Sequence, residues 1–406
     1  MSWVSGQARV GGRRRRSGIL AVARRAGAQV FGSQSALRQA DWLLLAAVLA
    51  LTMLGTLVIW SATEPVLRAQ GGNPHAYLMK QLLNVALGLT LMVLVGSLDS
   101  RQLRLFAPVL YVASCLGLLA VLTPLGSIVN GARSWISIGA GFQIEPSEFA
   151  KLSVIVISAM LLAEVRQGEQ RPRFAAVAKA LGVAAVPILL VAAEPDLGVM
   201  IVLLLIIVGM IALSGVRLRW LGALIAGAAL AVTAIARLHL LKAYQVSRLT
   251  SFINPSADPR GTGYSAAQAQ IAIGSGGLHG TGLFHGPLIA GGFVPEQNTD
   301  FIFAVVGNEL GFVGAMAVLG LLALLLVCAL RICSRAEDQF GMLVAAGVAI
   351  WFAVQAFVNI GMTLGIMPVT GLPLPFVSYG GSAMFADMIA IGLLQSVRRR
   401  RNVFAS

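Results

Sequence analysis

The chain has 406 residues, of which 57% are apolar and only 11% are charged, and its mean hydropathy is +0.84. Globular chains carry roughly a quarter charged residues, so this composition excludes an ordinary soluble domain. The three cysteines, Cys115, Cys328 and Cys333, lie in or beside apolar runs, which excludes a disulfide framework and a zinc finger. The 45 glycines indicate packed membrane helices, because small side chains let helix backbones approach closely in lipid.

Apolar segments long enough to cross a bilayer, about 20 residues each, recur along the chain. We expect ten such spans, and the expected fold class is therefore an all-α polytopic membrane protein. The spans are expected near residues 41–62, 77–97, 103–123, 147–164, 174–192, 197–214, 219–238, 300–330, 341–366 and 381–397. No internal repeat is evident, so residues 41–400 are expected to form one transmembrane domain between a tail at 1–40 and a short end at 401–406.

The net charge of +14 raises the question of nucleic-acid binding, which the distribution of the basic residues answers. With a cytoplasmic N-terminus, most of the 30 Lys and Arg fall in the tail before Asp41, in alternate loops, and in the run at 398–401. This is the positive-inside pattern, so both termini are expected in the cytoplasm and no nucleic acid is expected as a partner. The tail is expected to be a disordered segment that sets topology, with contact to anionic lipid headgroups as the alternative.

The acidic residues and the longest connection lie on the opposite, outer face. The outer acids are Glu64, Glu145, Glu148, Glu194, Asp196, Asp258, Glu296 and Asp300. Residues 239–299 form a long, glycine-rich outer connection with a helix-like segment at 264–273, so we expect a structured lid on the membrane surface. Shorter outer loops are expected at 124–146, 193–196 and 368–380, and the four loops could converge on one site.

Common catalytic motifs are absent from the sequence. The glycine-rich run at 274–280 misses the G-x-G-x-x-G spacing because His279 interrupts it, and we interpret its glycines as permitting tight turns. No H-E-x-x-H, G-x-S-x-G or C-x-x-C motif supports a metalloprotease, serine-hydrolase or thiol-redox function. The four histidines lie in loops without metal-ligand spacing.

Several charged residues lie at or inside the expected spans. Glu148 and Lys151, three residues apart, share a helix face and can pair, either as a self-neutralising ion pair or as a substrate-facing pair. Asp196 is expected to be a helix N-cap. Glu309 and Asp387 lie inside spans and are expected to face other helices.

The roles of two outer-loop residues cannot be decided from their local sequence. Arg133 has no acid near it in the sequence and could face an anionic group. Asp258 lies in a loop rich in Pro and Gly, where a single aspartate is most often a turn former.

A series of motifs recurs in order through the outer loops. They are Gly131-Ala132-Arg133-Ser134-Trp135, Pro146-Ser147-Glu148 with Lys151, Glu194-Pro195-Asp196, Asp258-Pro259-Arg260-Gly261 with Gln268, residues 271–278, Pro295-Glu296-Gln297-Asn298-Thr299-Asp300 and residues 371–382 including Ser378. Together they resemble the SEDS family of cell-wall polymerases over roughly residues 41–400. The stretch at 271–278 resembles the RodA, or elongation, branch more than the FtsW division branch.

The resemblance implies a peptidoglycan glycosyltransferase that polymerises Lipid II, the undecaprenyl-diphosphate-linked disaccharide-pentapeptide, at the outer face of the cytoplasmic membrane. It implies that Asp258 is the catalytic base for the acceptor hydroxyl, in an inverting single displacement that gives β-1,4 glycan. Arg133 and Lys151 are the expected cations for the diphosphate, with Glu148 orienting Lys151. The other expected substrate-binding residues in the matching motifs are Asp196, Gln268, Glu296, Asp300 and Ser378.

The resemblance also implies a partner, a class B penicillin-binding protein transpeptidase. A divalent cation, Mg²⁺ or Mn²⁺, is a possible cofactor whose ligands are unknown. The chain departs from the family in having Glu145 where Gln is usual and Asn308 where the first of two Glu residues is usual. An extra negative charge at Glu145 is expected to weaken the hold of Arg133 on phosphate.

The sequence leaves three alternatives open: a flippase for lipid-linked precursors, an FtsW-type division polymerase, and a scaffold without catalysis. A transporter concentrates charges along a path through the membrane midplane. Here the charged motifs cluster in the outer loops, with only Lys80, Glu309 and Asp387 placed deeper. This distribution favours an enzyme acting at the membrane surface.

Overall fold

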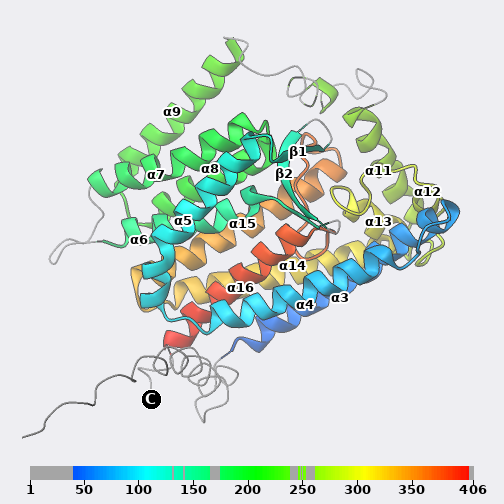
Figure 1. Cartoon of the computed structure of the whole chain (residues 1–406), viewed down its shortest axis with the longest axis horizontal. Helices are drawn as coiled ribbons and strands as arrows, with labels where there is room; N and C mark the ends of the chain where they lie inside the picture. The colour runs from blue at the N-terminus through cyan, green and yellow to red at the C-terminus, as the bar shows by residue number, and fades with distance from the viewer. Residues whose placement is uncertain are drawn as a thin grey trace, which may run out of the picture.

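The structure is a computed structural model that describes residues 40–129, 132–139, 142–164, 174–237, 246, 248, 250–252 and 261–401. It is predominantly helical, which confirms the expected fold class (Figure 1). The helices are α3 (Trp42–Ala69), α4 (Ala76–Gly96), α5 (Ser100–Leu122), α6 (Pro146–Leu162), α7 (Phe174–Ala193), α8 (Leu197–Leu213), α9 (Leu218–Arg237), α11 (Thr262–Gly276), α12 (Pro287–Ala290), α13 (Ile302–Glu309), α14 (Gly311–Ser334), α15 (Gln339–Thr363) and α16 (Gly381–Arg401).

Most predicted spans correspond to one helix, with ends that differ by a few residues. Within the described ranges, six helices are long and apolar enough to cross a membrane, namely α3, α4, α5, α7, α14 and α15. Helices α6 and α8 have 17 residues each, so the structure supports a polytopic protein without fixing the count at ten spans. Helix α3 continues through Pro65 to Ala69, beyond the predicted end at 62. The helix-like segment expected at 264–273 is helical and lies within α11.

The span predicted at 300–330 is not one continuous helix: the short helix α13 precedes the membrane-length helix α14, and the two meet at Leu310 and Gly311. Gly311 has a φ of +66°, a left-handed conformation that glycine adopts without a steric penalty. The segment 277–282 supplies hydrogen bonds across the break: the Gly282 amide donates to the Glu309 carbonyl at 3.0 Å, and the Phe312 amide donates to the Gly277 carbonyl at 3.0 Å. Continuous hydropathy hides such a break because both helices are apolar.

The loop expected at 124–146 contains a three-stranded antiparallel sheet that the sequence analysis did not predict. Its strands are β1 (Gly126–Val129), β2 (Ala132–Gly139) and β3 (Phe142–Ile144), in the order β1-β2-β3. In the register, Ile136 of β2 lies opposite Gly126 on one side and Ile144 on the other. The sheet contacts α5, α6 and the start of α16, so it covers one end of the helical bundle.

Glycine allows close packing between α4 and α16, which run side by side (Figure 1). A Cβ atom at Gly392 would lie 2.7 Å from the Met92 carbonyl oxygen and 3.2 Å from the Gly96 nitrogen. Any larger residue would therefore push the two backbones apart, as expected for glycine-mediated packing in lipid. Helix α6 lies at the centre, with nearly all its side chains buried, whereas α9 leans away from the bundle beside α8.

Candidate active site

A cavity of about 430 Å³ lies at the end of the bundle that carries the sheet. Its walls come from the start of α4, the sheet, the turn between α7 and α8, the connection before α13, and the segment between α15 and α16. The lining residues are Tyr77, Lys80, Asn84, Ser134, Trp135, Gln143, Glu145, Pro195, Asp196, Arg248, Glu296, Asn298, Thr299, Asp300, Thr370, Gly371, Pro373, Tyr379, Gly380, Gly381 and Ala383. The four predicted outer loops therefore converge, as the sequence indicated.

Three of the acidic residues predicted to bind substrate, Asp196, Glu296 and Asp300, line this cavity together. Asp196 is the N-cap of α8, where its carboxylate accepts a hydrogen bond from the Val199 amide at 3.0 Å, which confirms the expected cap. The backbone of Asp300 is held in place because its carbonyl accepts a hydrogen bond from Asn359 Nδ2 at 2.8 Å. The structure brings these acids to one site, and their roles toward a substrate stay predictions.

Burial raises the pKa of the cavity carboxyls. It raises the pKa of Asp300 to about 7, with the nearby charge of Glu296 adding to the effect and Arg248 opposing it. Burial likewise raises the pKa of Asp196, and it raises that of Glu145 well above its ordinary value, with Glu148 and Asp196 adding to the rise. With a pKa of about 7, Asp300 carries less than a full negative charge at neutral pH, which lowers the repulsion that an anionic group would meet in the cavity.

Two cations, Arg248 and Lys80, line the cavity, and the sequence analysis assigned neither of them to a site. Arg248 Nη1 donates to the Thr370 carbonyl at 2.8 Å. A Cβ atom at Gly371 would lie 3.5 Å from Asp300 Oδ2 and 3.8 Å from Arg248 Nη1, so both charged groups approach the same backbone position. Lys80 was expected to lie deep, but it is exposed near the start of α4. The sequence could have pointed to both residues, because basic residues in outer segments are exceptions to the positive-inside pattern.

The predicted ion pair between Glu148 and Lys151 is present and fully buried, with side-chain exposures of 1% and 0%. Lys151 Nζ lies 2.8 Å from Glu148 Oε1 and 2.7 Å from Oε2, and it donates to Gln355 Oε1 at 2.9 Å. The ammonium also lies 4.7 Å from the centroid of the Trp351 ring. Neither residue of the pair lines the cavity, but their charges affect the pKa of Asp196, which does. Direct contact between Lys151 and a substrate stays a prediction.

Ser378 and Gln268, also predicted to bind substrate, do not line the cavity. Ser378 is buried, where its hydroxyl donates to the Thr299 carbonyl at 2.6 Å and accepts from the Leu374 amide at 2.7 Å. It therefore fastens the segment before α16 to the residue next to Asp300. Gln268 is partly buried on α11.

Two predicted site residues cannot be placed as side chains. Asp258 lies in the segment 253–260, outside the described residues. The backbone of Arg133 lies in β2 opposite Ile128, and the position of its side chain is likewise outside the described part of the chain. The assignments of Asp258 as base and Arg133 as phosphate ligand stay predictions.

The deep acids Glu309 and Asp387 are each 1% exposed and face the bundle, as expected. Asp387 accepts a hydrogen bond from the Phe376 amide at 3.2 Å, and so holds the segment before α16. Asn308, one of the departures from the family pattern, donates to the Ala272 carbonyl at 3.0 Å and to Ser275 Oγ at 2.7 Å, linking α13 to α11.

Across the described ranges, no group of three or more His, Cys, Asp or Glu residues is placed to hold a metal ion. Binding of Mg²⁺ or Mn²⁺ stays a prediction.

Comparisons with known proteins agree in pointing to one family. A family model of cell cycle proteins that covers FtsW, RodA and SpoVE matches residues 41–403. The peptidoglycan glycosyltransferase MrdB of Escherichia coli K12 is 38% identical over 365 residues, which cover 90% of this chain and 95% of MrdB.

Two solved structures are similar over nearly their full length. A chain from a peptidoglycan synthase complex that coordinates polymerization and crosslinking aligns with a TM-score of 0.74 at 33% identity, covering 89% of this chain and 98% of that chain. The rod shape determining protein RodA of Thermus thermophilus aligns with a TM-score of 0.64 at 30% identity, covering 89% and 97% respectively.

Proposed function

The chain belongs to the FtsW, RodA and SpoVE family of cell cycle proteins, and from this premise we propose that it is a peptidoglycan glycosyltransferase of the RodA, or elongation, type. It is an integral protein of the bacterial cytoplasmic membrane that polymerises Lipid II on the outer face, with both termini in the cytoplasm. The observation that carries the proposal is the cavity in which four outer loops bring two cations together with carboxyls of raised pKa.

The donor's diphosphate is bound by the cations of the cavity. Arg248 presents a planar guanidinium suited to paired contacts with phosphate oxygens, and Lys80 adds a point charge at the rim. Lys151 does not line the cavity. Its positive charge, held in place by Glu148, attracts the diphosphate at longer range. Arg133 lies in β2, the strand whose Ser134 and Trp135 line the cavity, and is the further cation that the family resemblance assigns to the diphosphate. The raised pKa of Asp300, about 7, lowers its negative charge at neutral pH and so limits repulsion of the incoming diphosphate.

The reaction is one displacement at the donor's anomeric carbon. The acceptor sugar hydroxyl forms the new C–O bond while the bond to the diphosphate breaks, and inversion converts an α-linked donor into a β-1,4 glycan. The hydroxyl proton passes to a carboxylate, which we assign to Asp258, and the electron pair of the broken bond leaves with undecaprenyl diphosphate. Positive charge at the cavity stabilises the negative charge that develops on the leaving group.

The origin of the lining residues favours an enzyme over a flippase. They come from helix ends and the connections between helices, at one end of the bundle. A transporter instead binds its substrate near the midplane, at interrupted helices. We propose a penicillin-binding protein of class B as the partner, supported by the similarity to a chain of a synthase complex that couples polymerization with crosslinking.

Polymerisation of purified Lipid II by the detergent-purified protein, with and without a class B partner, tests the proposal. We expect glycan ladders from the wild type, none from Asp258→Asn, and roughly tenfold or greater loss for Arg248→Gln, since one transition-state donor is worth this much or more. Arg237→Gln removes the same charge from an exposed site outside the cavity and is the matched control. Equal activity of Arg248→Gln and the control would exclude this cavity as the donor site.

A further inference from the structure

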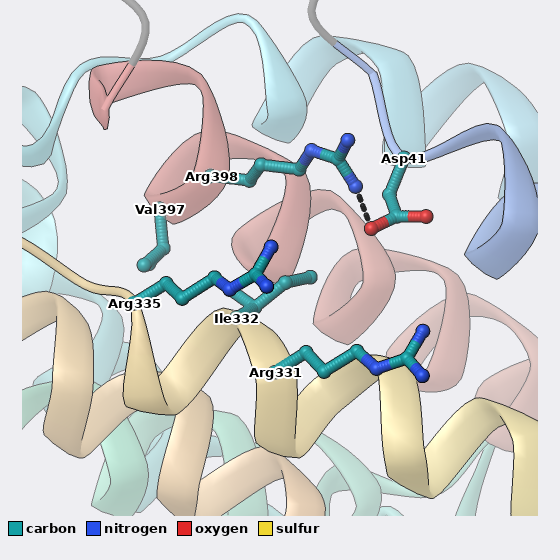
Figure 2. A pocket seen from close by; sticks show the side chains of 6 residues that line it. All are labelled: Asp41, Arg331, Ile332, Arg335, Val397 and Arg398. Carbon is teal, nitrogen blue, oxygen red and sulfur yellow. Dashed lines mark ion pairs between the residues drawn. The ribbon is translucent and has the colours of Figure 1, made fainter.

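A second cavity, of about 250 Å³, lies at the opposite end of the bundle, where α3 begins and α14 and α16 end. Its lining residues are Asp41, Arg331, Ile332, Arg335, Val397 and Arg398. Figure 2 shows the three arginine side chains extending in the same direction, two from α14 and one from α16, with Asp41 facing Arg398. Polymerisation chemistry uses none of these residues.

The cavity carries more positive than negative charge. Arg398 forms an ion pair with Asp41. Within the described part of the chain, Arg331 and Arg335 have no carboxylate partner, although both face the cavity. They are four residues apart on α14 and so lie on the same helix face, one turn from each other. Two guanidinium charges therefore remain uncompensated at this cavity.

Other arginines at the same end of the bundle do have carboxylate partners. Arg104 pairs with Asp338 at 2.8 Å, and Arg399 pairs with Asp99 at 3.2 Å. Positive charge at the cytoplasmic ends of helices is enough to set membrane topology. That role requires neither a cavity nor arginines without carboxylate partners beside it. The lack of partners for the two arginines that line a cavity points to a ligand that supplies the missing negative charge.

We propose that this cavity binds the headgroup phosphate of an anionic glycerophospholipid from the adjacent leaflet. Guanidinium groups hold phosphate oxygens in paired hydrogen bonds, and basic pockets between membrane helices on the cytoplasmic side are suited to acidic lipid headgroups. Arg331 and Arg335 contact the phosphate, and Arg398, held by Asp41, closes the side of the cavity formed by α16.

The apolar surface beside the cavity favours a lipid over a free phosphate ion. Val327 lies one helical turn before Arg331 on the same face of α14 and is 43% exposed, and the adjacent Leu330 is 56% exposed. Trp42, next to Asp41, is 59% exposed, and tryptophan is favoured at the membrane–water interface. A headgroup in the cavity would thus have its acyl chains along an apolar stripe of α14.

Binding of radiolabelled dioleoyl phosphatidylglycerol to the delipidated full chain in detergent micelles tests the site, with dioleoyl phosphatidylcholine as the neutral lipid. The test variant is Arg331→Gln/Arg335→Gln. The matched control is Arg101→Gln/Arg217→Gln, which removes two exposed arginines at the same end that do not line the cavity. We expect at least a tenfold preference for phosphatidylglycerol in the wild type, about tenfold weaker binding in the test variant, and less than a twofold change in the control.

Three results would overturn the inference: no preference between the two lipids, equal losses in both double variants, or displacement of the lipid by millimolar glycerol 1-phosphate, which would make this a site for free phosphate. Size-exclusion elution and thermal stability report folding. Because both side chains are exposed, the substitutions leave the core unchanged. If the double variant aggregates, Arg331→Gln and Arg335→Gln alone carry the test, each with an expected loss of about threefold.

Discussion

Replacing Lys151 by Met would leave the Glu148 carboxylate buried without its cation. In the native protein both Glu148 oxygens lie within 2.8 Å of Lys151 Nζ, and neither side chain reaches solvent. Methionine fills a similar volume but cannot donate a hydrogen bond, so Gln355 Oε1 loses its 2.9 Å donor as well. The variant thus keeps the packing of α6 against α15 and removes only the charge and its hydrogen bonds.

The expected cost follows from this burial. Removing one partner of a buried ion pair typically destabilises a protein by about 3–5 kcal/mol, because the remaining charge has lost both water and its counterion. At roughly 2 °C per kcal/mol for a large domain, the apparent Tm should fall by about 6–10 °C. The double variant Lys151→Met/Glu148→Gln removes both charges and should recover most of this loss.

Thermal unfolding in detergent, followed by fluorescence-detected size exclusion, measures the four corners of this double-mutant cycle. Lys80→Met, which removes an exposed ammonium, is the control and should change the apparent Tm by less than 1 °C. We expect the double variant to be stable but poorly active, because the leaving diphosphate loses the field of Lys151. An apparent Tm for Lys151→Met within 1 °C of the wild type would contradict the expected destabilisation, since a buried carboxylate cannot lose its counterion without cost.

Three further outcomes follow from the packing and the cavity. Gly392→Val should lower the apparent Tm by several degrees and reduce the yield of monodisperse protein, because its Cβ would lie 2.7 Å from the Met92 carbonyl oxygen; Gly320→Val, where a Cβ meets nothing within 4 Å, is the control. Ser378→Ala leaves the Leu374 amide without its acceptor and should cost about 1–3 kcal/mol in unfolding free energy, read as a lower apparent Tm, whereas an unchanged Tm would show that this bond contributes nothing. The pKa of Asp300 is about 7 in the folded state, above its ordinary value near 4, so the folded state binds more protons between these values and stability falls as pH rises from about 4 to 7. Asp300→Asn should flatten this part of the pH profile of the apparent Tm, and a slope equal to that of the wild type would contradict the assignment.

Hydropathy and charge distribution were sufficient to predict the helices and the end of the bundle where the site lies. Apolar length and loop charge are properties of contiguous sequence, so the ends of α7 and α8 came within two residues of their predicted positions. The break at Gly311 was not predictable in this way. It depends on hydrogen bonds to a segment about 30 residues earlier, and nothing in the local composition of α13 and α14 marks it.

The candidate site was predicted only in part, because local features are readable from sequence and long-range contacts are not. Acids at helix starts, such as Asp196, are recognisable because capping is a local property. Arg248 was missed because its place in the cavity depends on the segment at 370–371, which lies far away in the sequence and supplies the acceptor for its guanidinium. Ser378 was expected to bind substrate, but its hydroxyl is already used between two backbone groups.

At the break between α13 and α14, the segment 277–282 ties the two helices together. Its backbone forms hydrogen bonds with the last turn of α13 and the first turn of α14. A Cβ atom at Gly280 would lie 2.1 Å from the Glu309 carbonyl oxygen, so the segment is packed tightly against the break. The Phe284 amide extends the connection to Ser61 of α3 at 2.6 Å. A displacement of α11 would therefore be transmitted through these backbone hydrogen bonds to α13, α14 and α3.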